Sequence, residues 1–237
     1  AGGSGFKQIK LPSGVIVAGS SATYTVSQNG SYSFVVYDNA GNSRTISEQV
    51  TKIDKEAPGG GILGNPVNWT NKDATLTLNA ADTGGAGVKG VYLPNGTFVS
   101  TTTTASYVAT QNGTYTFRTV DFAGNETSVS VTVTKIDKVA PTVASVGGNP
   151  TQWTNQSQTL RVTGTDALSG VTAIKRPDNT VINGVVTDYT VHQNGGYVFT
   201  LTDAAGNSVT YTVDVTKIDK GNPSQSSVNI SVNNSQQ

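Results

Sequence analysis

Apolar and polar residues alternate along most of the chain. Tyr32, Phe34 and Val36 are separated by single residues, and residues 115–119 and 197–201 repeat this alternation. A period of two places one set of side chains on the buried face of a sheet. Turn sequences interrupt the alternating runs about every 8 to 12 residues, and no segment has the helical period. The pattern predicts an all-β chain built from antiparallel β-sandwiches.

The chain also repeats its own sequence three times. Thr-Lys-Ile-Asp-Lys occurs at residues 51–55, 134–138 and 216–220, at spacings of 83 and 82 residues. Ala-Gly-Asn returns at the same spacings, each time two residues after an Asp. The repetition predicts an incomplete domain in residues 1–55 that lacks its first strands, two full domains in residues 56–138 and 139–220, and a C-terminal linker with a candidate donor strand in residues 221–237.

Each repeat has a tyrosine at the start of its penultimate strand and a tight turn after that strand. The tyrosines follow Gln-Asn-Gly, and we expect their hydroxyl groups to bond to the main chain at tyrosine corners (Tyr32, Tyr115 and Tyr197). The turn is Asp-x-Ala-Gly-Asn, in which we expect the glycines to adopt positive φ (Gly41, Gly124 and Gly206). Residues 24–26 are expected to form an earlier strand of the first unit.

Two of these motifs follow one another in a fixed order. Asp-x-Ala-Gly-Asn precedes a strand rich in Val and Thr, and Lys-Ile-Asp-Lys-x-Ala-Pro comes next. This order resembles the tandem bacterial Ig-like repeats of secreted and cell-surface proteins, over nearly the whole chain. The resemblance implies tandem immunoglobulin-like antiparallel β-sandwiches, the first one incomplete, an extracellular place on a bacterial cell surface, and a stalk, adhesin or surface-assembly role. It identifies no ligand, because one fold carries many functions.

Composition and charge exclude several other classes of function. The chain has 15 Lys and Arg against 15 Asp and Glu, so it lacks the basic excess of a protein that binds nucleic acid. It contains no Cys, and no apolar run approaches the roughly 20 residues of a membrane span. The single histidine, His192, excludes a multi-His metal site within one chain and fits a surface imidazole. Without a nucleophile–base pair or a supported cofactor motif, the sequence predicts that the protein is not an enzyme.

Six aspartates recur around the linkers between repeats. In a sandwich, the loops after the second and the sixth strand share the end at which the preceding linker arrives. We therefore expect two groups, Asp54 with Asp82 and Asp121, and Asp137 with Asp166 and Asp203. Each group is a candidate oxygen site for calcium, which is the one cofactor that the sequence suggests and is not a required one. The alternative is that these carboxylates cap turns through nearby main chain.

The two ends of the chain are complementary in sequence. Residues 2–7 align with residues 84–89, so the first unit lacks the strand that residues 76–80 supply in the second. Val228, Ile230 and Val232 alternate as the inward side chains of that strand would. We therefore expect head-to-tail self-association, in which this segment covers core side chains of a neighbour's first unit (Phe6, Tyr32 and Phe34). The alternative is that a longer repeat stalk was cut at an arbitrary point.

The sequence thus predicts a non-enzymatic extracellular structural protein, a cell-surface stalk or filament subunit joined by donated C-terminal strands. The alternative is an adhesin or accessory module that binds a glycan or a host protein. A binding module is expected to expose aromatic residues in one unit that the other units lack. Trp69 and Trp153 instead recur at matching positions, which favours a structural role for both. The sequence does not identify a surface ligand.

Overall fold

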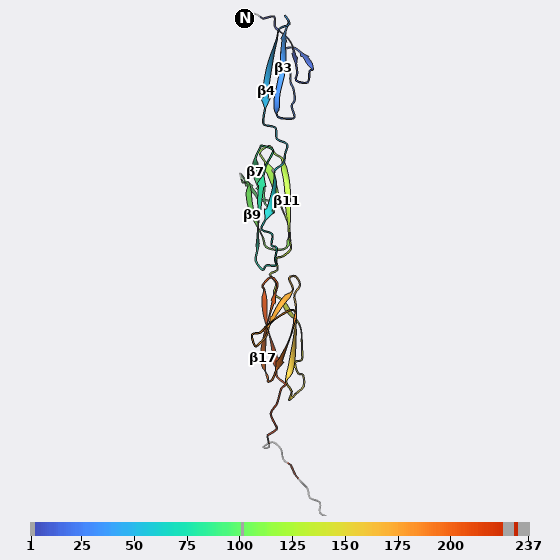
Figure 1. The fold of residues 1–237 in the computed structure, drawn as a ribbon, viewed down its shortest axis with the longest axis vertical. Coiled ribbons are helices and arrows are strands. Elements are labelled where there is room, and N and C mark those ends of the chain that lie inside the picture. Colours follow the sequence, from blue (N-terminus) through green and yellow to red (C-terminus); the bar gives the residue numbers. More distant parts are fainter. Residues whose placement is uncertain (1–2, 101, 225–229, 232–237) are drawn as a thin grey trace, which may run out of the picture. The chain divides into compact units, whose positions relative to one another are not determined.

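The computed structural model describes residues 3–100, 102–224 and 230–231, and this part of the chain contains strands and turns but no helix (Figure 1). The first repeat contains β1 (Phe6–Lys10), β2 (Ile16–Ala18), β3 (Gly30–Asp38) and β4 (Ser43–Val50). The second contains β5 (Gly59–Leu63), β6 (Ala74–Ala81), β7 (Val88–Tyr92), β8 (Phe98–Ser100), β9 (Thr104–Ala109), β10 (Gly113–Asp121) and β11 (Glu126–Val133). The third contains β12 (Thr142–Gly147), β13 (Gln158–Thr165), β14 (Val171–Lys175), β15 (Val181–Asn183), β16 (Val186–Val191), β17 (Gly195–Asp203) and β18 (Ser208–Val215).

The second and third repeats each contain a three-stranded and a four-stranded sheet. The strand orders are β5-β6-β9 and β11-β10-β7-β8 in the second repeat, and β12-β13-β16 and β15-β14-β17-β18 in the third. The strands pair antiparallel, as in β12 with β13 and β17 with β18. This arrangement confirms the predicted all-β class of immunoglobulin-like sandwiches.

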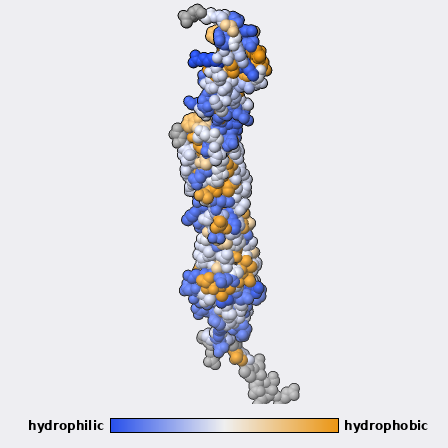
Figure 2. Space-filling model, turned by 45° about the horizontal axis from the view of Figure 1, so that its top comes forward, coloured by the Kyte–Doolittle hydropathy of each residue, from blue (hydrophilic) through white to orange (hydrophobic). Residues whose placement is uncertain are grey.

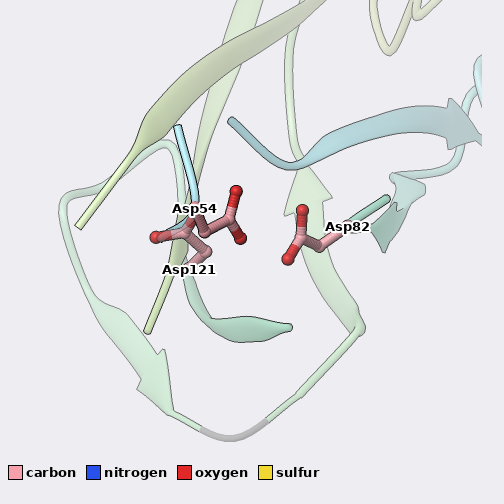
Figure 3. Close-up of side chains that lie close together, drawn as sticks. All are labelled: Asp54, Asp82 and Asp121. Carbon is pink, nitrogen blue, oxygen red and sulfur yellow. The ribbon is translucent and has the colours of Figure 1, made fainter. Parts of the chain in front are cut away.

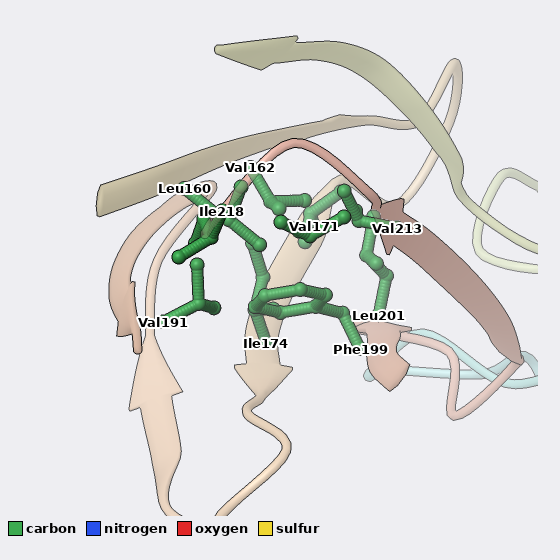
Figure 4. Close-up of a cluster of buried hydrophobic side chains, with 10 residues drawn as sticks. Leu160, Val162, Val171, Ile174, Val191, Phe199, Leu201, Val213 and Ile218 are labelled. Carbon is green, nitrogen blue, oxygen red and sulfur yellow. The ribbon is translucent and has the colours of Figure 1, made fainter. Parts of the chain in front are cut away.

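The core of the third repeat shows why the alternation predicted the strands. Leu160 and Val162 point inward from β13 in the smaller sheet and pack with Ile174, Phe199 and Leu201 of the larger sheet (Figure 4). All five side chains are fully buried. The inward positions of β6 in the second repeat are buried in the same way, so the second strand of each full repeat supplies one wall of the core.

The described residues of the first repeat form a four-stranded sheet alone, in the order β2-β1-β3-β4. The prediction of a strand over residues 24–26 is wrong, because this segment has no strand structure. Its counterpart β16 pairs along its whole length with β13, and the described first repeat has no strand in the place of β13. Without that partner, the main chain of residues 24–26 has no ladder of hydrogen bonds to join. Tyr24 still packs against the sheet, with its ring centroid 6.0 Å from that of Phe34.

The predicted turns are present in all three repeats, and the tyrosine corners are confirmed in the first and third repeats. Tyr32 donates a hydrogen bond of 2.7 Å to the carbonyl oxygen of Gln28, and Tyr197 donates one of 2.8 Å to that of Gln193. The glycine of each Asp-x-Ala-Gly-Asn turn has φ near 90° (Gly41, Gly124 and Gly206). Positive φ is the conformation for which a residue without a Cβ is favoured, so the turn sequence follows from its geometry.

The proposed donor segment falls largely outside the described residues. Val228 and Val232 lie outside them, so their expected strand stays a prediction. Ile230 is described, has no strand structure and is 81% exposed. A large apolar side chain in this position has most of its surface available for contact with another chain.

Contacts between Cα atoms divide the chain into two compact units. The first comprises the described residues of Ala1–Leu63, Leu76–Tyr107 and Tyr115–Val131, and the second those of Gly64–Thr75, Val108–Thr114 and Thr132–Gln237. The linker after the first repeat (residues 51–55) lies wholly in the first unit, together with Asp54, Asp82 and Asp121. The linker after the second repeat (residues 134–138) lies wholly in the second unit, together with Asp137, Asp166 and Asp203. Each junction between repeats is therefore described within one unit.

Candidate functional site

Each linker between repeats is hydrogen-bonded both to the repeat before it and to the repeat after it, through two consecutive residues. In the first linker, Ile53 exchanges two hydrogen bonds of 2.8 Å with the side chain of Asn29, which belongs to the repeat before it. The next residue, Asp54, accepts a hydrogen bond of 2.7 Å at Oδ2 from the main-chain N–H of Ala86 in the repeat after it. The isoleucine therefore attaches the linker to one repeat and the aspartate attaches it to the next.

The second linker repeats these contacts. Ile136 exchanges hydrogen bonds of 2.9 Å with the side chain of Asn112, and Asp137 Oδ2 accepts one of 3.0 Å from the N–H of Ser169. Asp137 also donates from its main-chain N–H to the carbonyl oxygen of Thr70 at 2.9 Å. Two independent linkers with one bonding scheme indicate that the scheme belongs to the repeated sequence.

A turn asparagine completes each junction. Asn125 bonds to both carboxylate oxygens of Asp121 within its own turn, and its Nδ2 also donates to the carbonyl oxygen of Asp54 at 3.3 Å. Asn207 makes the same bonds to Asp203 and donates to the carbonyl oxygen of Asp137 at 2.9 Å. The asparagine amide thus links the Asp-x-Ala-Gly-Asn turn to the incoming linker.

The six predicted aspartates meet in the two expected groups. Asp54, Asp82 and Asp121 each offer a carboxylate oxygen within 4.8 Å of the others (Figure 3). The oxygens of Asp137, Asp166 and Asp203 lie equally close to one another. Asp121, Asp137 and Asp203 are almost fully buried. Like charges this close repel one another, so each carboxylate needs compensating donors.

Main-chain and asparagine N–H groups provide those donors. In the first group every carboxylate oxygen accepts at least one hydrogen bond, including those of Asp82 from Gly84 and Gly87. In the second group, Asp166 Oδ1 accepts from Leu168 and Gly170. Hydrogen bonds to an ionised carboxylate are stronger than neutral ones, and they stabilise the charged form.

Two of these carboxyl groups have pKa values below the ordinary range. Burial alone raises the pKa of Asp121, but the hydrogen bonds from the side chain and main chain of Asn125 outweigh burial and lower it. Burial is likewise the largest influence on Asp137, and hydrogen bonds from Ser169 and Val139 outweigh it and lower the pKa. Both groups are therefore ionised at neutral pH, and their charges are satisfied by fixed dipoles.

Two alternatives were predicted for these aspartates, a calcium site and the capping of turns. Calcium takes six to eight oxygen ligands, and three carboxylates with nearby carbonyl groups are of the right chemistry. The residues that would hold the ion are Asp54, Asp82 and Asp121, or Asp137, Asp166 and Asp203. The hydrogen bonds that the oxygens already accept match the turn-capping alternative in detail, including the linker carboxylates. Calcium stays a prediction.

Sequence reasoning missed the asparagines of the junctions. Asn29 and Asn112 belong to the repeated Gln-Asn-Gly, and Asn125 and Asn207 to the repeated turn. Their recurrence at fixed spacing from Lys-Ile-Asp was the available signal. The contacts themselves join residues 24 to 71 positions apart, which local pattern does not relate. His192 is exposed, as predicted, and its Nδ1 lies 2.8 Å from Ser157 Oγ.

Two of the three predicted assembly residues of the first repeat, Phe6 and Phe34, line an open apolar groove. Phe6, Ile9, Ala22, Phe34, Val36 and Ile46 surround about 400 Å³ of space. Phe34 is half-buried, whereas its counterparts Phe117 and Phe199 are fully buried. Phe6 is 64% exposed, whereas its counterpart Val88 is half-buried and its counterpart Val171 is buried. Tyr32 is also half-buried, and its ring packs against Tyr24 at 6.1 Å. Figure 2 shows an apolar patch on the surface near the N-terminal end.

Part of the chain is similar to a known domain family. Residues 15–55 match a family model of the bacterial Ig-like domain. No curated protein matches the chain. Among solved structures, the chain is similar to the SGBP-B protein of the mixed-linkage glucan utilization locus of Bacteroides ovatus, determined with a mixed-linkage heptasaccharide, at 16% identity over 88% of this chain and 59% of that chain, with a TM-score of 0.21. It is also similar to dimeric latent PorU from Porphyromonas gingivalis, at 12% identity over 85% of this chain and 25% of that chain, with a TM-score of 0.23.

Both solved structures are longer than the matched region, since the chain spans 59% and 25% of their lengths. Within the described part of the chain there is no helix with the length and apolar character needed to cross a bilayer.

Proposed function

We propose that the chain is a non-enzymatic structural protein of a bacterial cell surface, a stalk or filament subunit whose copies join head to tail. The C-terminal segment of one copy lies in the apolar groove of the first repeat of the next copy. The observation that carries this proposal is the difference in burial between Phe34 and its counterparts Phe117 and Phe199. At this sequence position the side chain is half-buried in the first repeat and fully buried in the other two.

The occupant of the groove is inferred from the strand that covers the other two cores. In the second repeat, β6 turns Ala74, Leu76 and Leu78 inward, and all three are buried. Val228, Ile230 and Val232 have the same spacing and an apolar character. An extended segment that joins an exposed sheet edge gains main-chain hydrogen bonds, and its alternate side chains fill the pockets of the face. Residues 24–26 would gain the pairing partner that they lack.

The test changes the donor segment while leaving the second and third repeats intact. We expect deletion of residues 226–237 to abolish association, measured by sedimentation velocity and by negative-stain imaging. Ile230→Asp should do the same, because burying a carboxylate without a partner costs on the order of several kcal/mol. Ser231→Asp is the matched control, since an alternating strand turns this neighbour outward, and it should associate as the unchanged chain does.

A synthetic peptide of residues 226–237 should cap the first repeats and shorten any fibres. An unchanged chain that stays monomeric at high concentration overturns the proposal. Association that survives the deletion overturns strand donation specifically. If residues that precede this sequence in a longer stalk fill the groove instead, sedimentation velocity of the unchanged chain should show a monomer.

The second candidate is a module that binds a glycan or a host protein. The observation that favours it is Trp153, which is 64% exposed, whereas its counterpart Trp69 is half-buried. The ring also lies 4.8 Å from the Lys217 ammonium group. Exposed aromatic rings are frequent at binding surfaces. Binding of this kind needs no self-association, so the sedimentation measurement separates the two candidates.

A further inference from the structure

In the described part of the chain, one linker and one turn lack hydrogen bonds that their counterparts make. The third linker is bonded to the repeat before it, because Ile218 donates from its N–H to Asn194 Oδ1 at 2.8 Å and Asp219 donates to the carbonyl oxygen of Thr154 at 2.8 Å. Asp219 itself is exposed, and within the described ranges its Oδ1 accepts a hydrogen bond from Gly221 alone. Among the described residues, neither Asp219 Oδ2 nor the Asp219 carbonyl oxygen accepts a hydrogen bond. In the two internal linkers the corresponding atoms are bonded to the next repeat.

The first repeat presents the complementary half. Asn42 bonds to both carboxylate oxygens of Asp38 at 2.8 Å, as Asn125 and Asn207 do in their turns. Among the described residues the Asn42 side chain bonds to Asp38 alone, and Asn42 is exposed, whereas Asn125 and Asn207 are half-buried under a linker. One hydrogen of its amide is therefore directed to no described acceptor.

One main-chain hydrogen bond beside the Asn42 turn is the same as in the two internal junctions. Asn39 donates from its N–H to the carbonyl oxygen of Gly5 at 3.0 Å, and the equivalent bonds from Phe122 to Gly87 and from Ala204 to Gly170 are both 3.1 Å. This bond places the main chain of residues 4–5 beside the turn of the first repeat, as the equivalent bonds do for residues 86–87 and 169–170. The N–H of Ser4 thus corresponds to those of Ala86 and Ser169, which bind the linker aspartates.

We propose that the linker of residues 217–219 in one copy docks on the Asp38–Asn42 turn of a second copy and forms a third junction like the internal two. Asp219 Oδ2 accepts a hydrogen bond from the N–H of Ser4, and Asn42 Nδ2 donates to the Asp219 carbonyl oxygen. This inference rests on the proposed head-to-tail assembly and names the polar contact that places the second copy.

The docked linker leaves enough chain for the donated strand. Ile230 lies eleven residues after Asp219. An extended chain of that length spans up to about 36 Å. A nine-residue strand such as β3 spans roughly 30 Å. A segment tethered at the turn end of the first repeat therefore reaches along its whole groove, and the junction raises the effective concentration of the segment there.

The test measures the dissociation constant of the full chain by sedimentation velocity in four single variants. Asp219→Ala and Asn42→Ala should each raise it roughly three- to tenfold, the effect of one hydrogen bond. Asp178→Ala is the control for the first, since Asp178 Oδ1 also accepts from an N–H two residues on, in an exposed turn. Asn95→Ala is the control for the second, since Asn95 is also an exposed turn asparagine, and its Oδ1 accepts a hydrogen bond from the N–H of Thr97 within its own turn. Both controls should leave the dissociation constant unchanged.

Deletion of residues 226–237 distinguishes this inference from the proposed function. If the deletion abolishes association while Asp219→Ala and Asn42→Ala behave as their controls, the junction is wrong and strand donation stands. If association survives the deletion and the two variants weaken it, the junction stands and strand donation is wrong. A full chain that never associates overturns both.

Discussion

At the scale of single residues, buried aspartates hold the linkers through charge-assisted hydrogen bonds. Asp121 and Asp137 are 0% and 1% exposed, yet hydrogen bonds lower their pKa values against the effect of burial. The arrangement resembles an oxyanion held by fixed N–H groups, in which dipoles take the place of water. The linkers are therefore attached by interactions that depend on ionisation.

This dependence predicts that the junctions weaken in acid. A carboxyl group with a lowered pKa in the folded state contributes its stability fully above the unfolded-state value, near 3.8, and loses it as the pH falls through the lower folded value. We expect the melting temperature to fall steeply below about pH 4. Asp121→Asn should cost about 1–3 kcal/mol at pH 7 and flatten the acid decline, because the amide does not titrate. Calorimetry from pH 7 to pH 2 checks this.

The matched control for this titration is Asp178→Asn. Asp178 is exposed, and its lowered pKa comes first from the N–H of Thr180 within one turn. Its replacement should leave the acid decline of the junctions in place. An equal acid slope in Asp121→Asn and in the unchanged chain would contradict the ionisation argument.

At the scale of strands, the sequence pattern predicted those features of a strand that depend on residues close to one another in the sequence. The alternation in residues 32–36 and 197–201 placed β3 and β17 because inward and outward positions are set within one strand. The segment 24–26 has the same alternation and no strand, because pairing depends on a partner far away in the sequence or in another chain. The aspartate groups followed from the shared end of the sandwich, whereas the junction asparagines needed the structure.

The uncovered core predicts unequal effects of one substitution at equivalent positions. Phe199→Ala should destabilise the third repeat by about 3–5 kcal/mol, as for a fully buried aromatic ring. Phe34→Ala should cost the monomer roughly 1–2 kcal/mol, because less apolar area leaves water on folding. Hydrogen exchange resolved along the sequence gives the local stability of each repeat.

In the assembled state, Phe34→Ala should also raise the dissociation constant, since the ring then contacts the donated strand. Phe117→Ala is the control, because Phe117 lies in a core that is already complete. If Phe34→Ala costs the monomer as much as Phe199→Ala, the first repeat has a finished core and needs no donated strand.

At the scale of the whole molecule, the net charge is zero but acidic side chains are concentrated at the linkers. The chain has equal numbers of acidic and basic residues, yet six of its aspartates gather in two groups at the linkers. The chain has no disulfides, so its junctions depend on these groups, the asparagines and the strand cores. What stabilises the aspartate groups therefore decides how firmly consecutive repeats are attached, whether by N–H donors alone or with a cation.

Removal of calcium from the intact chain separates these two possibilities. If N–H donors alone compensate the carboxylates, the melting temperature in excess EGTA should equal that in excess calcium. If calcium binds as well, it stabilises the folded state by mass action, by about 2.7 kcal/mol at a hundredfold excess over its dissociation constant. The melting temperature would then rise by several degrees, and Asp82→Asn or Asp166→Asn would abolish the rise, whereas Asp178→Asn would not. Because every carboxylate oxygen of the Asp54 group already accepts a hydrogen bond, we expect no rise. A calcium-dependent increase that needs Asp82 would contradict this expectation and assign the junctions as calcium sites.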